Sequence, residues 1–185
     1  MVRAEDLFFD LKENESIIAL SYIFNTGVSG VIANKNRILT EDEFFEYKKI
    51  INKRKKGLPI QYAIGKWNFY GRDFIVDSRA LIPRPETEGL VEWVISDLSL
   101  IGYNICDMGT GAGIIPITIL AELENENLNK IKIENITGID ISEKAISLAE
   151  ENDRFVLNSE LQGRINWIKS DLFENVNHYL KPSIR

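Results

Sequence analysis

The chain has 185 residues, which is room for one ordinary domain or for a small domain with part of another. Its formal net charge of −6 disfavours free nucleic acid as a partner, and no apolar run is long enough to cross a membrane. One cysteine and one histidine exclude an intramolecular disulfide and argue against a metal site or a Ser–His–Asp triad.

The first 75 residues predict a small helical domain. The N-terminus mixes acidic with apolar residues, unlike a signal peptide, and we expect a cytoplasmic protein. Apolar residues at helical spacing predict a helix over 14–24. Thr40 and Glu43 form a capping-box pattern that predicts a second helix, ending near Gly57. We interpret the six basic residues over 48–56 as a solvated helix end rather than an RNA contact.

A β-hairpin is predicted next. Aromatic and β-branched residues surround Gly71-Arg72-Asp73, which favours two short strands over 67–77. Pro85 suits the first position of a helix that continues to Leu98. We place the domain boundary in this region, with one domain over 1–75 and the other over 76–185.

Strand-like and helix-like segments alternate from Ile101 onwards. Strands are predicted over 103–109, 131–140 and 164–171, and helices over 113–123 and 142–157. Pro116 falls near the start of the first of these helices, where proline is tolerated, and Ser142 suits the N-cap of the second. This alternation predicts an α/β fold with a Rossmann-like parallel sheet and right-handed crossovers.

The segment DMGTGAGII, residues 107–115, carries the main functional signal. Glycines at 109, 111 and 113 lie between a predicted strand and a predicted helix, where free amides favour a polar ligand. Asp140 ends the next strand and could accept hydrogen bonds from ribose hydroxyls. The pattern predicts a nucleoside-containing cofactor, although a tight turn without any ligand remains an alternative.

The glycine spacing favours S-adenosylmethionine over NAD. The dinucleotide fingerprint is G-x-G-x-x-G, whereas this chain has G-x-G-x-G with Ile114 in the last position. The Asp107 carboxylate would repel a pyrophosphate, but it would suit a ligand that carries an ammonium and a sulfonium.

Four stretches closely resemble one family of bacterial methyltransferases, which modify a glutamine in the Gly-Gly-Gln (GGQ) loop of peptide chain release factors. They are LPIQYAIGKWNFYGRDFIVDSRALIPRPETEGLVEWVI, DMGTGAGIIPI, TGIDISEKAISLAEEN and SDLF. The resemblance implies an N-terminal helical bundle for substrate recognition over 1–75, a β-hairpin linker and a partial class I methyltransferase domain over 76–185. It also implies S-adenosylmethionine as cofactor and a release factor as protein substrate.

The resemblance also implies roles for particular residues. Asp140 would hold the ribose, and Ile141 would lie against the adenine. The methionine half of the cofactor would be lined by Asp107, Gly109, Thr110, Gly111 and Gly113. The adenine amino group would be met by Asp171 and Leu172. The active site would be walled by Arg84, Pro85, Thr87 and Glu88.

The family's catalytic Asn-Pro-Pro-Tyr segment does not occur in this sequence. We therefore assign no catalytic residue, and we expect a truncated or frameshifted member, or a fragment, that keeps the cofactor half-site without activity. The alternative is a non-catalytic fragment that binds the release factor or the cofactor. With three strands only, the first strand has an open edge, and we expect self-association through it.

Overall fold

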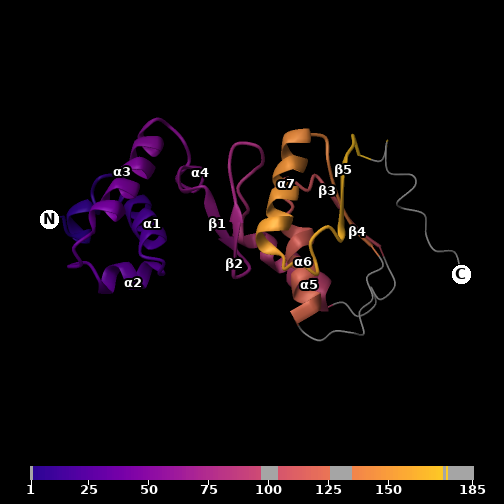
Figure 1. Cartoon of the computed structure of the whole chain (residues 1–185), viewed down its shortest axis with the longest axis horizontal. Coiled ribbons are helices and arrows are strands. Elements are labelled where there is room, and N and C mark those ends of the chain that lie inside the picture. Colours follow the sequence, from indigo (N-terminus) through magenta and orange to yellow (C-terminus); the bar gives the residue numbers. More distant parts are fainter. Residues whose placement is uncertain (1, 97–103, 126–134, 173, 175–185) are drawn as a thin grey trace, which may run out of the picture. The chain divides into compact units, whose positions relative to one another are not determined.

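The computed structural model describes residues 2–96, 104–125, 135–172 and 174 (Figure 1). The chain divides into two compact units, Met1–Gly65 and Lys66–Arg185. The structure therefore groups the hairpin with the C-terminal unit, whereas the sequence analysis expected it to end the N-terminal domain. None of the described helices has the length and apolarity that a bilayer crossing requires.

The N-terminal unit is a small helical bundle. Its elements are η1 (Ala4–Leu7), α1 (Glu13–Ile23), α2 (Val28–Ala33), α3 (Glu41–Lys55) and α4 (Ile60–Ile64). Apolar side chains from all five elements share one core. Tyr47 is completely buried in this core, and its hydroxyl donates to the Leu7 carbonyl at 2.9 Å.

The predicted capping box at the start of α3 is confirmed. The Glu43 amide donates to Thr40 Oγ1 at 3.2 Å, and the Thr40 amide donates to Glu43 Oε2 at 2.9 Å. From the middle of this helix to its last turn, three basic side chains form ion pairs within the unit. The ion pairs are Lys48–Asp10, Lys49–Glu46 and Arg54–Glu15. Much of the positive charge over 48–56 is therefore neutralised locally.

The C-terminal unit begins with the hairpin. Strands β1 (Lys66–Phe69) and β2 (Arg72–Ile75) are antiparallel. Tyr70 and Gly71 between them both have positive φ, which is the signature of a two-residue type I′ turn. The short helix η2 (Pro85–Thr87) and then α5 (Glu88–Ser96) follow, so the predicted helix start at Pro85 is confirmed.

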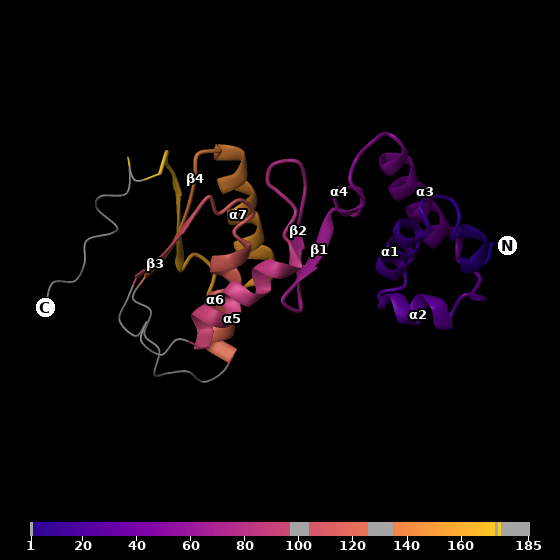
Figure 2. The same cartoon turned by 180° about the vertical axis from the view of Figure 1, so that it is seen from behind.

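A parallel sheet forms the rest of this unit. Its order is β3 (Asn104–Met108), β4 (Asn135–Asp140), β5 (Ile165–Lys169), connected by α6 (Ile114–Asn125) and α7 (Glu143–Val156). This arrangement confirms the predicted α/β alternation. Helices α5, α6 and α7 lie on the same side of the sheet in both views (Figures 1 and 2). Sheet and helices share one core with the hairpin, through Phe69 and Phe74.

Strands β3 and β4 each lead into the next helix, α6 and α7, through a short turn. Pro116 lies in the first turn of α6, and Ser142 caps α7 by accepting from the Ala145 amide at 3.3 Å. Among the described strands, β3 pairs with β4 alone, so no described strand occupies its other edge. Self-association through that edge stays a prediction.

Candidate functional site

The glycine turn, residues 109–113, connects the end of β3 to the start of α6. Gly109, Gly111 and Gly113 have φ values of 79°, 54° and 74°, which favour glycine over any residue with a Cβ. The amides of Gly109 and Thr110 both donate to the Ile139 carbonyl at 2.8 Å. The turn is therefore anchored to the carboxyl end of β4, where a parallel sheet presents its ligand site.

Two carboxylates flank this turn, as the sequence predicts. Asp107 Oδ2 accepts a hydrogen bond from Thr110 Oγ1 at 2.7 Å. Asp140 Oδ2 accepts from the Gly111 amide at 3.0 Å, and Asp140 Oδ1 accepts from the Ser142 amide at 2.9 Å. Each carboxylate oxygen still has an acceptor site for a ligand hydroxyl. The structure thus brings the acidic ends of β3 and β4 to one turn.

The electrostatics of this site favour a cationic ligand group. Burial raises the pKa of Asp107, the charge of Asp140 raises it further, and the hydrogen bond from Thr110 lowers it. A positive charge beside Asp107 would compensate the ionised carboxylate, whereas a phosphate would add a second negative charge. These two carboxylates suit an ammonium or sulfonium better than a pyrophosphate.

The space around the three glycines differs in a way that the sequence does not reveal. A Cβ added to Gly109 would meet no atom within 4 Å, and one added to Gly111 would meet Ala80 Cβ at 3.6 Å. The backbone is therefore open at Gly109, whereas Gly111 lies beside the segment that contains Ala80. A Cβ on Gly113 would lie 2.7 Å from the Trp167 ring, so this glycine permits packing. Its contact with a cofactor stays a prediction.

The residues predicted to meet the adenine lie at the same end of the sheet. Ile141 directly follows β4, and its side chain is 65% exposed. The Ser170 amide donates to the Asp140 carbonyl at 3.0 Å, which brings the segment after β5 beside the end of β4. Asp171 and Leu172 follow there, both exposed, with Leu172 at a φ of 47°. Exposed apolar side chains at this edge suit a flat aromatic ring.

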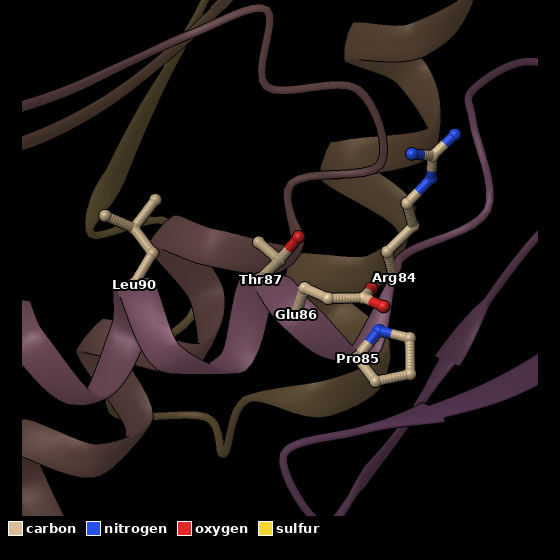
Figure 3. A pocket seen from close by; sticks show the side chains of 5 residues that line it. All are labelled: Arg84, Pro85, Glu86, Thr87 and Leu90. Carbon is tan, nitrogen blue, oxygen red and sulfur yellow. The ribbon is translucent and has the colours of Figure 1, made fainter.

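The segment predicted to wall the active site forms a shallow depression of about 630 Å³ (Figure 3). Its lining residues are Arg84, Pro85, Glu86, Thr87 and Leu90. Glu88 is not among them, because its carboxylate accepts from the Tyr70 amide at 2.8 Å and so fastens the hairpin turn to α5. In Figure 3 the side chains of Arg84, Thr87 and Leu90 rise from one side of this segment.

Sequence reasoning missed Gly138, in the middle of β4. It pairs with Asp107 in the sheet register, and a Cβ there would lie 2.4 Å from Trp167 Cζ3 and 2.9 Å from Thr110 Oγ1. Gly138 therefore leaves room for the hydroxyl that binds Asp107. A glycine inside a strand is itself a sign that another group approaches closely, so this signal was available in the sequence.

Sequence reasoning also missed Asn152 on α7. Its side chain has no exposed surface and binds backbone groups of Ile75 and Ala112. The clue was its place on the apolar face of the helix, after Ala145, Leu148 and Ala149, because a buried amide needs hydrogen-bond partners.

Residues 9–65 match the family model described as the PrmC N-terminal domain. The release factor glutamine methyltransferase of Bacillus anthracis is 37% identical over 144 residues, covering 76% of this chain and 48% of the relative. The protein of that name from Bacillus subtilis (strain 168) is 32% identical over 167 residues, covering 86% and 54% respectively.

A bifunctional methyltransferase of Rickettsia prowazekii is 34% identical over 182 residues, covering 88% of this chain and 33% of the relative. The chain spans about half the length of the release factor methyltransferases that it matches. Together, these similarities support the assignment of the chain to the family of release factor glutamine methyltransferases.

Proposed function

We propose that this chain forms the S-adenosylmethionine-binding part of an enzyme that methylates the glutamine side-chain amide in the GGQ motif of peptide chain release factors. The relatives' names give release factor glutamine methylation as the family function. One observation carries the cofactor proposal. The Gly111 amide binds Asp140 while the Thr110 hydroxyl binds Asp107, so two carboxylates share one accessible glycine turn.

Each part of the cofactor has a matching group in this proposal. Asp107 lies where it can compensate the positive charges of the methionine half, and Asp140 keeps acceptor capacity for the ribose hydroxyls. Exposed Ile141 and Leu172 offer apolar contact to the adenine. S-adenosylmethionine, when bound, would supply a methyl group on a sulfonium: the nucleophile would attack the methyl carbon, and the S–CH3 bond would break with its electron pair going to the leaving thioether.

The protein's task in this reaction is orientation. An amide nitrogen is a weak nucleophile, so it must be held in line with the methyl group and its developing charge must be stabilised. We propose that the segment with Arg84, Pro85 and Thr87 walls the space where the glutamine enters. The chain offers no Asn-Pro-Pro-Tyr segment to orient the amide.

The same glycine turn also suits a second candidate, a fragment that binds the cofactor or the release factor without catalysis. Incubating the chain with labelled S-adenosylmethionine and a release factor separates the two. Methylation of the glutamine supports the catalytic proposal. Cofactor binding, or capture of the release factor, without methylation supports the second candidate.

Isothermal titration calorimetry with S-adenosylmethionine and with NAD tests the cofactor itself. We expect binding of S-adenosylmethionine alone, and a drop in affinity of about tenfold or more in Asp140→Ala, which removes both acceptor oxygens. Glu160→Gln is the matched control, since it removes a negative charge from an exposed position after α7. Equal affinity for NAD, or no effect of Asp140→Ala, would contradict the proposal.

A further inference from the structure

Asn152 is a polar side chain with no solvent contact, in the C-terminal half of α7. Burying an amide costs free energy unless its donors and acceptor are paired. Here the pairing is to backbone groups outside its own helix, which is unusual for a helical asparagine. The side chain therefore connects parts of the unit that are distant in sequence.

Its hydrogen bonds reach two segments. The Ile75 amide donates to Asn152 Oδ1 at 2.7 Å, and Asn152 Nδ2 donates to the Ile75 carbonyl at 3.1 Å. Nδ2 also donates to the Ala112 carbonyl at 3.0 Å. The amide thus pairs with the last residue of β2 as a neighbouring strand would, and it uses its second donor on the glycine turn.

Both segments border the candidate cofactor site. Ala112 lies inside the glycine turn. It stands between Gly111, whose amide binds Asp140, and Gly113, which packs against Trp167. The chain that leaves Ile75 reaches Ala80, whose Cβ lies 3.6 Å from the position of a Cβ on Gly111. One side chain therefore sets the spacing between the glycine turn and the segment that covers it.

We infer that Asn152 is a positioning residue for the cofactor site, holding the glycine turn and the segment after β2 in binding register. This inference rests on the proposed function. Asn152 would act through the Ala112 carbonyl, which lies in the same turn as the Gly111 amide that binds Asp140. Loss of its donors should therefore weaken cofactor binding more than it weakens the fold.

The sharpest variant is Asn152→Asp. It keeps the shape and the acceptor for the Ile75 amide, but it turns a carboxylate oxygen toward the carbonyls of Ile75 and Ala112. We expect the Kd for S-adenosylmethionine to rise about tenfold or more, measured by calorimetry at a temperature where the variant is folded.

Leu148→Ala is the matched control for stability. Leu148 is fully buried one turn earlier on α7, and it has no hydrogen bond to the turn, so its truncation weakens the fold through a cavity. We expect this variant to lose stability while it keeps the wild-type Kd. Equal losses of affinity in both variants would overturn the inference, because the weaker binding of Asn152→Asp would then be explained by its lower stability alone.

A second readout does not depend on the cofactor. Amide hydrogen exchange should accelerate at Gly111 and Gly113 in Asn152→Asp, relative to amides of β5, whereas Leu148→Ala should accelerate all of them alike. If the wild-type chain does not bind S-adenosylmethionine, the proposed function fails and the exchange pattern still decides the inference. Unchanged relative exchange at the two glycines in Asn152→Asp would overturn it.

Discussion

Replacing Gly138 with alanine tests whether β4 must leave room for the groups around the glycine turn. The added Cβ would lie 2.4 Å and 2.6 Å from two ring carbons of Trp167, and 2.9 Å from Thr110 Oγ1. Trp167 is not free to move aside. Its Nε1 donates to buried Asp153 at 3.0 Å, and the same ring fills the space beside Gly113. Any shift must therefore break or bend existing contacts.

We expect Gly138→Ala to lower the free energy of unfolding of the C-terminal unit by about 2 to 4 kcal/mol. Forcing an extra carbon into a packed core costs roughly 1 to 3 kcal/mol, and a weakened bond from Trp167 to the Asp153 carboxylate adds about 1 kcal/mol. Displacement of Thr110 would also loosen its bond to Asp107, so affinity for S-adenosylmethionine should fall as well.

Urea unfolding followed by tryptophan fluorescence measures this effect. All three tryptophans lie in the C-terminal unit, so the signal reports on that unit alone. Gly89→Ala is the matched control. Gly89 lies exposed in α5, where a Cβ meets no atom within 4 Å, and this variant should be neutral or stabilised by up to about 1 kcal/mol.

A double-mutant cycle with Trp167→Phe identifies the cause. The smaller ring makes room for the new Cβ, so Gly138→Ala should cost at most about half as much in the Trp167→Phe background. The reasoning is refuted if Gly138→Ala stays within about 0.5 kcal/mol of the wild type, or if the two substitutions are additive.

Three further predictions follow from the described residues. Because burial raises the pKa of Asp107 above 3.8, ionisation costs stability above the folded-state pKa. Asp107→Asn should therefore stabilise the C-terminal unit at pH 7 and lose this gain toward pH 4, and it should also weaken cofactor binding. Urea unfolding at pH 7 measures the stability, and a less stable variant would contradict the prediction. Tyr47→Phe should cost the N-terminal unit about 1 kcal/mol by removing the buried hydrogen bond from the hydroxyl to the Leu7 carbonyl. Because burial raises the pKa of Tyr47 to about 12, the wild type should also lose stability as pH rises from 10, and circular dichroism should find no such loss from this residue in the phenylalanine variant. Sedimentation velocity should detect self-association that grows with concentration, and a monomer at every concentration would exclude pairing through β3.

The sequence by itself determined the features that depend on neighbouring residues. Thr40 caps α3 through Glu43, three residues away, and Ser142 caps α7 through Ala145. The alternation of strands and helices fixed the parallel sheet, and two acidic residues at strand ends located the glycine turn. These interactions are local, or follow from chain topology, so a pattern is enough to predict them.

Tertiary structure alone decided which partners meet across the chain. Asn152 binds Ile75 across a separation of 77 residues, and with Phe69 and Phe74 in the shared core this joins the hairpin to the C-terminal unit. The position of Trp167 makes Gly113 a packing residue while Gly109 stays accessible, although both are glycines of one motif. Sequence spacing does not fix such contacts, because they depend on how helix α7 and strand β5 pack against the turn.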